Sequence, residues 1–336
     1  AVALGWRGTV CAGVMRLSQA VGLSDPEIVA QLKGHGIRSR VEYLLRSPEW
    51  LVSNVRGLSA DKEADVRARI ISEAAAFPER CDELFVRAAG AAAAAGSFAV
   101  CPIECPVDTV LRGGLHTAEL VELVGGPATG KTQLCHHIAA VLAARHGPVV
   151  FLDTSAAFSA ARLAQIARAR GLPADRVLRS VERRMVTDAT GLLRALHKIR
   201  ADAATAGRAA VVVDSVAAVL MPIMARQHAK GSAVVAHVAA LLREIAAVGR
   251  CVVVTTNFAY ADRVRCSGEK PALGAVWDSV PHCRLHLSRD PDGAPGGRVV
   301  TLTKSNRMST GASVGVYLDA AGVVLSSDRD PVMSIC

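Results

Sequence analysis

The sequence predicts an α/β protein: a mostly parallel sheet with helices on both faces, antiparallel strands at one edge, and a small all-helical domain before it. From residue 107 onward, short β-rich apolar runs alternate with helical stretches, which is typical of βαβ units in a sheet covered on both faces. The last of these runs are close together and separated by Gly-rich turns such as Gly296-Gly297, which is typical of antiparallel additions. Residues 24–80, by contrast, show only helical patterns.

The N-terminal domain, residues 24–80, begins with a helix start signal. Ser24-Asp25-Pro26-Glu27 supplies a capping oxygen and places a proline where its missing N–H costs nothing. A short apolar face follows and ends near Gly34. One or two short helices are expected around Leu44–Val52, and a longer helix, charged on one side and apolar on the other, over Asp61–Phe77.

The segments that flank these helices offer little to a core. Residues 1–23 contain no Asp or Glu, as an organellar targeting segment would, but glycines interrupt any helical face, so we expect a frayed extension. Residues 81–106 are expected to form a linker, because they contain an Ala91–Ala95 run and the prolines Pro102 and Pro106. The α/β domain then spans residues 107–326 and is followed by a tail over residues 327–336.

Seven runs in the α/β domain have the length and composition of strands. They are Leu120–Val124, Val149–Asp153, Ala209–Asp214, Cys251–Thr256, His282–Leu287, Arg298–Thr303 and Val314–Asp319.

Length and composition narrow the function classes. The 336 residues are 51% hydrophobic and 21% charged, which excludes a chain disordered throughout. No run approaches the roughly 18 uninterrupted apolar residues of a membrane span, so no membrane association is expected. With 39 Lys and Arg against 30 Asp and Glu, the net charge of +9 suits a polyanionic partner. The nine cysteines are scattered, and Cys101 and Cys105 lack a second pair at zinc-ligand spacing, so we expect reduced thiols in an intracellular protein.

One motif carries the chemistry. Residues 125–132 read Gly-Gly-Pro-Ala-Thr-Gly-Lys-Thr and satisfy GxxxxGK[ST], directly after the Leu120–Val124 strand and before the helical stretch Gln133–Ala144. Glycines let such a loop curl around phosphate oxygens at a helix N-terminus, whose dipole favours anions. Lys131 is expected to reach the β- and γ-phosphates, and the Thr132 hydroxyl to be a ligand of Mg²⁺.

A second acidic element is the strand Val211-Val212-Val213-Asp214. A parallel strand places Asp214 at the C-terminal edge of the sheet, beside the phosphate loop, where it can orient Mg²⁺ through water. An aspartate after an apolar run more often caps a helix, but the phosphate loop upstream favours the metal role. ATP and Mg²⁺ are therefore the expected cofactors. The candidate nucleotide-binding residues are Gly125, Gly126, Pro127, Ala128, Thr129, Gly130, Lys131, Thr132, Gln133 and Asp214.

The order of these motifs resembles a known family. Val107–Leu115 precedes the phosphate loop, and Phe151–Thr154, the Asp214 strand, Val253–Asn257 and Lys270–Trp277 follow it. This order is similar to the RecA-like recombinase family of eukaryotes and archaea, and within it to the D-type paralogue group of homologous recombination. The resemblance implies a RecA-like P-loop ATPase core, a function in double-strand break repair, other RecA-like paralogues as partners in a heteromeric complex, and a location in the nucleus.

The sequence departs from that family at two positions. In active members the pair equivalent to Asp153-Thr154 is followed by a Glu that positions the attacking water, and Ser155 stands there instead. A hydroxyl is a poor proton acceptor at neutral pH, and losing a positioned base costs about 10²–10⁴ in rate. After the Cys251–Thr256 strand, Asn257-Phe258 replaces an Asn-Gln pair whose Gln senses the γ-phosphate. We therefore predict that ATP is bound well and hydrolysed slowly, and we assign no catalytic residue.

Two segments at the C-terminal edge of the sheet are the single-stranded DNA contacts that the resemblance implies: Met221–Ser232 and Phe258–Pro271. Both are expected to be mobile loops that offer cations to phosphates, with Tyr260 available for base stacking. The second segment has a net charge of only 3 − 2 = +1, so a solvated loop remains the alternative. The candidate DNA-binding residues are Arg226, Lys230, Arg263, Arg265 and Lys270.

A denser basic region runs from Arg162 to Arg184, with seven arginines against Asp175 and Glu182. Because several of these arginines alternate with Ala and Leu, we interpret the region as the solvated face of a helix rather than as a path for nucleic acid.

The pair Phe98-Ala99 lies in the linker. In the resembled family, a Phe-and-Ala hook at this place adds to the sheet edge of a neighbouring subunit. The spacing to Asp108 is not clearly that of the hook, so packing of Phe98 on its own domain remains the alternative.

Three functions stay in view. The favoured one is a weakly hydrolysing, ATP-binding recombinase paralogue that joins other paralogues and supports the strand-exchange filament on single-stranded DNA. The second is a fully active DNA-dependent ATPase that performs strand exchange itself, against which Ser155 and Phe258 argue. The third is a P-loop small-molecule kinase, against which the helical N-terminal domain and the edge strands argue.

Overall fold

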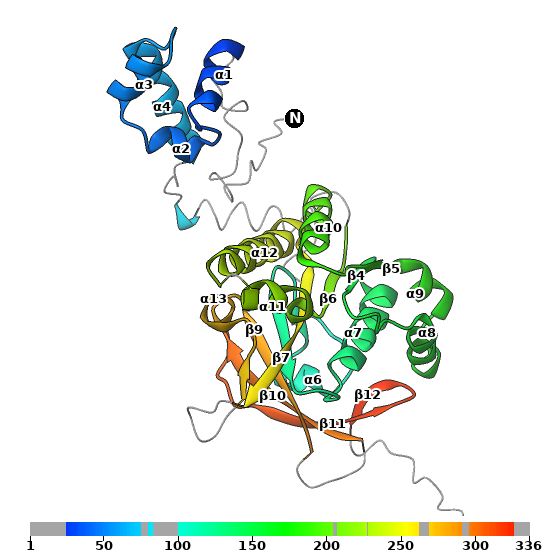
Figure 1. Ribbon diagram of the computed structural model, residues 1–336. Coiled ribbons are helices and arrows are strands. Elements are labelled where there is room, and N and C mark those ends of the chain that lie inside the picture. Colours follow the sequence, from blue (N-terminus) through cyan, green and yellow to red (C-terminus); the bar gives the residue numbers. More distant parts are fainter. Residues whose placement is uncertain are drawn as a thin grey trace, which may run out of the picture. The chain divides into compact units, whose positions relative to one another are not determined.

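The chain divides into two compact units, residues 1–90 and 91–336, in the computed structural model (Figure 1). The structure describes residues 25–74, 80–82, 100–203, 207–226, 228–261, 269–290 and 296–325. The limits predicted for the linker and the tail lie partly outside these ranges and remain predictions.

The described helices of the first unit lie where the sequence patterns predict them. Asp25, Ser39 and Ser47 each accept a hydrogen bond from a backbone N–H in the first turn of α1, α2 and α3, which satisfies donors that the helix leaves open. The helices are α1 (Pro26–Gly34), α2 (Arg40–Leu44), α3 (Pro48–Asn54) and α4 (Ala60–Ala74). Their apolar sides form a core of their own, which includes Ile28, Leu32, Ile37, Tyr43, Leu51, Val66 and Ile70.

The second unit is built around a ten-stranded sheet (Figure 1). Along the sheet the strands are β12 (Gly322–Leu325), β11 (Ser313–Asp319), β10 (Gly297–Ser305), β9 (Cys283–Arg289), β3 (Leu120–Gly125), β7 (Val252–Ala261), β6 (Ala210–Asp214), β4 (Val149–Asp153) and β5 (Val181–Met185), and β8 (Glu269–Pro271) pairs with β7. The strands from β9 to β5 are parallel, whereas β10, β11 and β12 are antiparallel additions. The predicted mostly parallel sheet with an antiparallel edge is confirmed. The run at His282–Leu287 belongs to both parts, because β9 pairs parallel with β3 and antiparallel with β10.

Helices cover both faces of this sheet. On one face lie α6 (Val107–Val110), α7 (Lys131–Arg145), α8 (Ala160–Ala169) and α9 (Ala174–Ser180); on the other lie α10 (Ala189–Ala201), α11 (Val216–Arg226), α12 (His228–Gly249) and α13 (Gly274–Asp278). Val212 packs with the first group and its neighbours Val211 and Val213 with the second, as the alternation of side chains along a strand requires. The strands β1 (Val100–Cys101) and β2 (Leu115–His116) form a separate two-stranded sheet.

Five of the described strands have no counterpart among the predicted runs: β1, β2, β5, β8 and β12. The sequence of β5, Val-Glu-Arg-Arg-Met, lacks an apolar run because the strand lies at the sheet edge and exposes most of its side chains. It lies within the basic region that ends at Arg184. The interpretation of that region as the solvated face of a helix is therefore wrong for its last residues.

The same interpretation is wrong for Arg162 and Arg170, which we call the arginine clamp. Both guanidinium groups donate hydrogen bonds to backbone carbonyls of residues 319–323, at the turn between β11 and β12. Arg170 also donates to the carbonyl of Glu104, at 2.7 Å. These arginines fasten the C-terminal hairpin to α8 and to the segment that enters the unit.

The predicted loop over Met221–Ser232 is largely helical. Helix α11 continues to Arg226 and α12 begins at His228. The residues of α11 that precede this segment, such as Val216, Ala217 and Leu220, are fully buried, and this burial favours a helix where the sequence suggested a loop.

Residues 231–249 of α12 are long and apolar enough to cross a membrane, by length and composition alone. Val235, Val238, Leu241, Leu242 and Ile245 of this helix are at most 1% exposed. Such burial against a sheet is the pattern of a core helix.

Candidate nucleotide-binding site

A cleft of about 350 Å³ opens where the phosphate loop joins β3 to α7, at the carboxyl ends of the parallel strands. It brings together residues that follow or end β3, β4, β6 and β7. Its lining consists of Pro127, Ala128, Thr129, Gly130, Lys131, Thr132, Gln133, Ser155, Asp214, Ser215, Ala218, Thr256, Phe258 and Leu318. Eight of the ten candidate nucleotide-binding residues are in this lining, and Gly125 and Gly126 form the start of the same loop.

At two positions the loop requires glycine, because neighbouring atoms leave no room for a Cβ atom. A Cβ atom on Gly125 would lie 2.2 Å from the backbone oxygen of Leu287. Gly130 has a φ of +98°, and a Cβ atom there would lie 2.8 Å from Leu318 of β11. The loop therefore depends on glycine at both ends, and the antiparallel edge of the sheet contributes to its walls.

The Lys131 ammonium lies inside the curl of the loop. Its Nζ atom donates hydrogen bonds of 2.7 Å to the carbonyl oxygens of Gly125 and Gly126. The residue is only 9% exposed. A cation held at this position, at the N-terminus of α7, faces the space in which a loop of this kind binds phosphate oxygens.

Asp214 fits the expected magnesium role. Its Oδ1 atom accepts a hydrogen bond of 2.5 Å from the Thr256 hydroxyl, whereas its buried Oδ2 atom has no hydrogen-bond partner in the described part of the chain. A buried carboxylate oxygen without a partner requires an explanation, and an oxygen-bound cation or its water shell is the chemistry that such an atom suits. Asp214 and Thr132 line the same cleft, so together they would hold Mg²⁺ beside the phosphates.

Ser155 lines the cleft where the resembled family has its Glu. Its side chain is exposed, and its backbone N–H donates to Oδ1 of Asp153, at 3.3 Å. Among the described lining residues, Asp214 is the only carboxylate. No second carboxylate of the described lining therefore replaces the missing base.

Asp153 is close to the cleft but is fully engaged by the protein. Its oxygens accept hydrogen bonds from three backbone N–H groups of residues 155–158 and from both Nε and Nη2 of Arg183, the latter at 2.7 Å. Burial acts to raise the pKa of Asp153, but the Arg183 guanidinium and these backbone donors outweigh it and lower the pKa. The carboxylate is thereby fixed as an anion that orders the turn carrying Ser155.

Phe258 stands where the resemblance implies a Gln that senses the γ-phosphate. Its ring is 39% exposed, lines the cleft, and lies with its centroid 5.8 Å from Nζ of Lys131, within the range of a cation–π contact. The ring has no hydrogen bond to offer a phosphate. Its backbone N–H donates to Oδ1 of Asn257.

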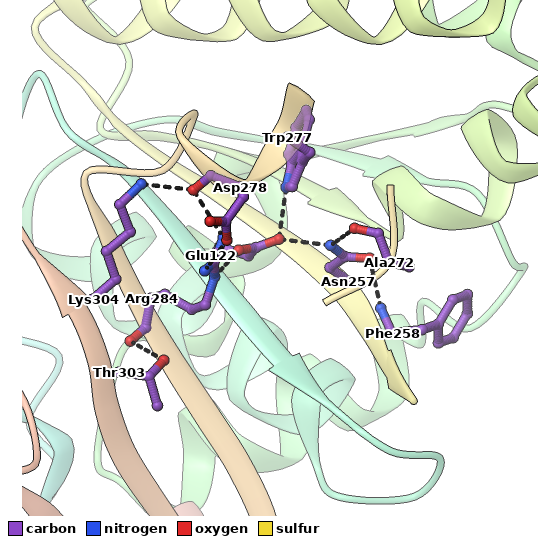
Figure 2. Close-up of polar contacts among 9 residues, drawn as sticks. All are labelled: Glu122, Asn257, Phe258, Ala272, Trp277, Asp278, Arg284, Thr303 and Lys304. Carbon is purple, nitrogen blue, oxygen red and sulfur yellow. Dashed lines mark hydrogen bonds and ion pairs between the residues drawn. The ribbon is translucent and has the colours of Figure 1, made fainter. Parts of the chain in front are cut away.

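Asn257 joins a buried polar cluster, shown in Figure 2, that is centred on Glu122. One oxygen of Glu122 accepts hydrogen bonds from Nδ2 of Asn257, at 2.8 Å, and from Nε1 of Trp277, at 2.6 Å, and the other accepts from Nε of Arg284. Asn257 also donates to the carbonyl of Ala272. The cluster thus anchors α13 and the residue Ala272 before it, just after the second candidate DNA segment, to β3, β7 and β9.

Arg284 is the charge partner of this cluster. Burial acts to lower the pKa of its guanidinium, but the Glu122 carboxylate and Asp278 raise it above the ordinary range. The Arg284 guanidinium therefore remains charged. No local sequence pattern indicates this pairing, because Glu122 and Arg284 are 162 positions apart.

His136 is a further residue of the site that sequence reasoning missed. Its Nδ1 atom lies 2.8 Å from the carbonyl of Thr132, and its Nε2 atom accepts a hydrogen bond from the Ser159 backbone N–H. Burial lowers its pKa, so the ring is neutral and donates through Nδ1. It links the first turn of α7 to the segment after Ser155.

The candidate DNA and partner residues are only partly described. Arg226 ends α11 and Lys230 lies in the first turn of α12. Lys270 lies exposed on β8, and Tyr260 on β7 is 51% exposed. The remaining candidates, Arg263, Arg265, Phe98 and Ala99, lie outside the described residues.

The described residues hold no group of three or more His, Cys, Asp or Glu side chains that could form a metal cluster. A magnesium ion in the cleft would accordingly be held by Asp214, Thr132, water and the nucleotide's own oxygens.

The loop between β3 and α7, the carboxylate at the end of β6 and the sheet with its antiparallel extension define a RecA-like P-loop domain, a class that generally binds ATP with Mg²⁺. The family model described as Rad51 matches residues 103–320. The chain belongs to the Rad51 family, and the resemblance to RecA-like recombinases is confirmed.

Relatives similar over almost the whole chain carry the name DNA repair protein RAD51 homolog 4. The protein of Bos taurus is 32% identical, over 92% of this chain and 96% of its own length, and that of Mus musculus is 30% identical, over 95% and 98%. Among solved structures, the RadB recombinase aligns with a TM-score of 0.59 at 24% identity, over 67% of this chain and 99% of its own, and this likeness shows the fold alone.

Proposed function

We propose that this protein is an ATP-binding recombinase paralogue of homologous recombination in the nucleus, which binds single-stranded DNA, assembles with other paralogues and hydrolyses ATP weakly. The observation that carries the proposal is the composition of the cleft lining. The described lining contains Lys131, Thr132 and Asp214, which would hold a triphosphate and Mg²⁺, whereas Ser155 supplies a hydroxyl where the resemblance implies a carboxylate base. The names of the similar proteins support a function in DNA repair.

Retention of nucleotide follows from residues that bind without reacting. The Lys131 ammonium, the N-terminus of α7 and the loop backbone supply positive potential, and Oδ2 of Asp214 supplies an oxygen for the metal's water shell. These groups act on the nucleotide before and after hydrolysis alike. They support binding rather than turnover.

Slow hydrolysis follows from Ser155 and Phe258. The Ser155 hydroxyl lines the cleft but does not accept a proton at neutral pH, and the Phe258 ring offers no hydrogen bond to a γ-phosphate. We expect this cleft to keep ATP bound for long periods, which suits a protein that stabilises an assembly.

Two surfaces support the roles with DNA and with other paralogues. Lys270 and Tyr260 lie exposed on neighbouring strands beyond the cleft, where a cation and an aromatic ring suit a single strand. β5 is an edge strand, which in the described part of the sheet pairs with β4 alone. An edge of this kind accepts an added strand from a partner.

The decisive experiment measures ATP turnover with and without single-stranded DNA. We expect slow turnover in the unmodified protein and a rise of about 10²–10⁴ in Ser155→Glu, because the carboxylate restores a positioned base. Ala157→Glu is the matched control: it adds the same charge at an exposed position outside the cleft lining and should leave turnover unchanged. Lys131→Ala should abolish ATP binding.

Brisk DNA-stimulated turnover in the unmodified protein would favour the fully active ATPase. ATP consumption that requires a small acceptor molecule would favour a kinase.

A further inference from the structure

Two histidine side chains face each other outside the nucleotide cleft. His197 lies on α10 and His237 on α12, and their Nε2 atoms are 3.3 Å apart. Both helices are fixed against the sheet, since Leu196 and Val238, which directly adjoin the two histidines, are fully buried. The packing of the helix backbones therefore holds the two imidazoles at this separation.

The surroundings of His237 single it out. It is the only polar residue among positions 233–242, which otherwise contain only Ala, Val and Leu. The ring is half-buried, and that of His197 is exposed. Two neutral imidazoles whose Nε2 atoms face each other share one N–H, so that one ring donates and the other accepts. One change of tautomer would turn both nitrogens into lone-pair donors 3.3 Å apart.

The separation of the two nitrogens matches that of two ligands on one tetrahedral ion. At Zn–N distances of about 2.0–2.1 Å, tetrahedral geometry places two ligand nitrogens about 3.3–3.4 Å apart. Octahedral geometry at the same bond lengths places neighbouring ligands only about 2.9 Å apart. Imidazole nitrogen is a favoured ligand of Zn²⁺. We propose that His197 and His237 form a two-histidine site for Zn²⁺ that bridges α10 and α12.

The remaining positions of the ion are open to water, because no third His, Cys, Asp or Glu of the described residues completes a cluster. Glu244, an acidic group on α12, is engaged at 3.3 Å by Arg200 of α10. Arg200 and Lys198 add positive charge on the α10 side, so we expect moderate affinity.

A bound ion would fasten the start of α12. This helix begins at His228, within the first candidate DNA segment, and His237 lies nine positions further on. A bridge to α10 at this point would hold the first turns of α12 against the body of the unit.

The test uses the full chain in a buffer with a non-chelating reductant, with Zn²⁺ as the probe and a chromophoric zinc indicator as competitor. We expect the unmodified protein to bind one more equivalent of Zn²⁺ at pH 7.5 than either His197→Gln or His237→Gln. Zn²⁺ at about 100 times its Kd should raise the Tm of the unmodified protein by a few degrees and leave the Tm of both variants unchanged.

His146→Gln is the matched control, because His146 is an exposed histidine that follows α7, far from both helices in the sequence, and it should behave as the unmodified protein. Equal zinc stoichiometry and equal Tm shifts in the unmodified protein and both variants would overturn the proposal and assign any bound zinc to other side chains. His197 is exposed, so His197→Gln is expected to fold even if His237→Gln does not.

Discussion

Asp153 and Asp214 end neighbouring parallel strands and are paired in register, yet they serve different purposes. Asp153 accepts hydrogen bonds from three backbone N–H groups and from Arg183, so the protein uses both of its oxygens. Asp214 shares one oxygen with Thr256 and keeps the other, buried at the cleft, without a partner in the described structure. The difference teaches that a strand-terminal aspartate is available to a ligand only where the fold leaves one of its oxygens without a hydrogen-bond partner.

Glu122 extends the comparison to a third buried carboxylate. Its two oxygens are occupied by donors from Asn257, Trp277 and Arg284 (Figure 2). Like Asp153, it is therefore a structural anion. The following predictions test this division, beginning with the largest expected effect.

Arg284→Met should lower the free energy of unfolding by about 3–5 kcal/mol, because it leaves the buried Glu122 charge without its cation. Urea denaturation of the full chain measures this loss. The double variant Glu122→Leu/Arg284→Met removes both charges and should recover most of the stability. A loss below about 1 kcal/mol in the single variant would show that Glu122 is not the structural anion described here.

Asp214→Asn should weaken ATP binding in the presence of Mg²⁺ by about tenfold or more, roughly 1.4 kcal/mol, and leave binding in EDTA unchanged. Titration with a fluorescent ATP analogue measures both affinities. Asp153→Asn is the matched comparison: it should lower stability while preserving the Mg²⁺ dependence of binding. The opposite pattern, with Asp153→Asn removing the Mg²⁺ dependence, would reverse the assignment of the two aspartates.

The smallest effect concerns pH. Folding lowers the pKa of Asp153 from its ordinary value of 3.8, so its stabilising contribution is fully present above that value and is lost as the pH falls through the folded pKa. Because the Arg183 side chain is 40% exposed, solvent screening limits the contribution of the Arg183–Asp153 ion pair to the free energy of unfolding to roughly 1 kcal/mol or less. Arg183→Leu should therefore lose stability less steeply between pH 5 and pH 3 in urea unfolding, and an unchanged slope would contradict the role given to Arg183.

The parts of the site that the sequence predicted are those encoded by adjacent residues. The phosphate loop is a continuous motif between a strand and a helix, and Asp214 ends an apolar run, so both could be placed from the sequence. The departures at Ser155 and Phe258 were also visible, and the structure places both side chains in the cleft lining.

The parts that could not be predicted depend on partners distant in the sequence. Which donors satisfy Glu122 is decided by residues 135 to 162 positions away, and no local pattern encodes that choice. The edge strand β5 lacked an apolar signature because its side chains are solvated. The sequence predicts a loop at the first candidate DNA segment because the burial of α11, which favours continuation of the helix, is a tertiary effect.

The arginine clamp has a consequence for how the α/β unit comes apart. Arg170 binds carbonyls at Glu104 and at Ala321, so a single guanidinium ties the first turns of the unit to its final hairpin. Separation of that hairpin from the sheet would remove hydrogen-bond acceptors from both Arg162 and Arg170. It would also weaken the contact between Arg170 and the segment around Glu104. The hairpin of β11 and β12 is thus tied to the rest of the α/β unit. We therefore expect the unit to unfold cooperatively, without earlier local unfolding of this hairpin.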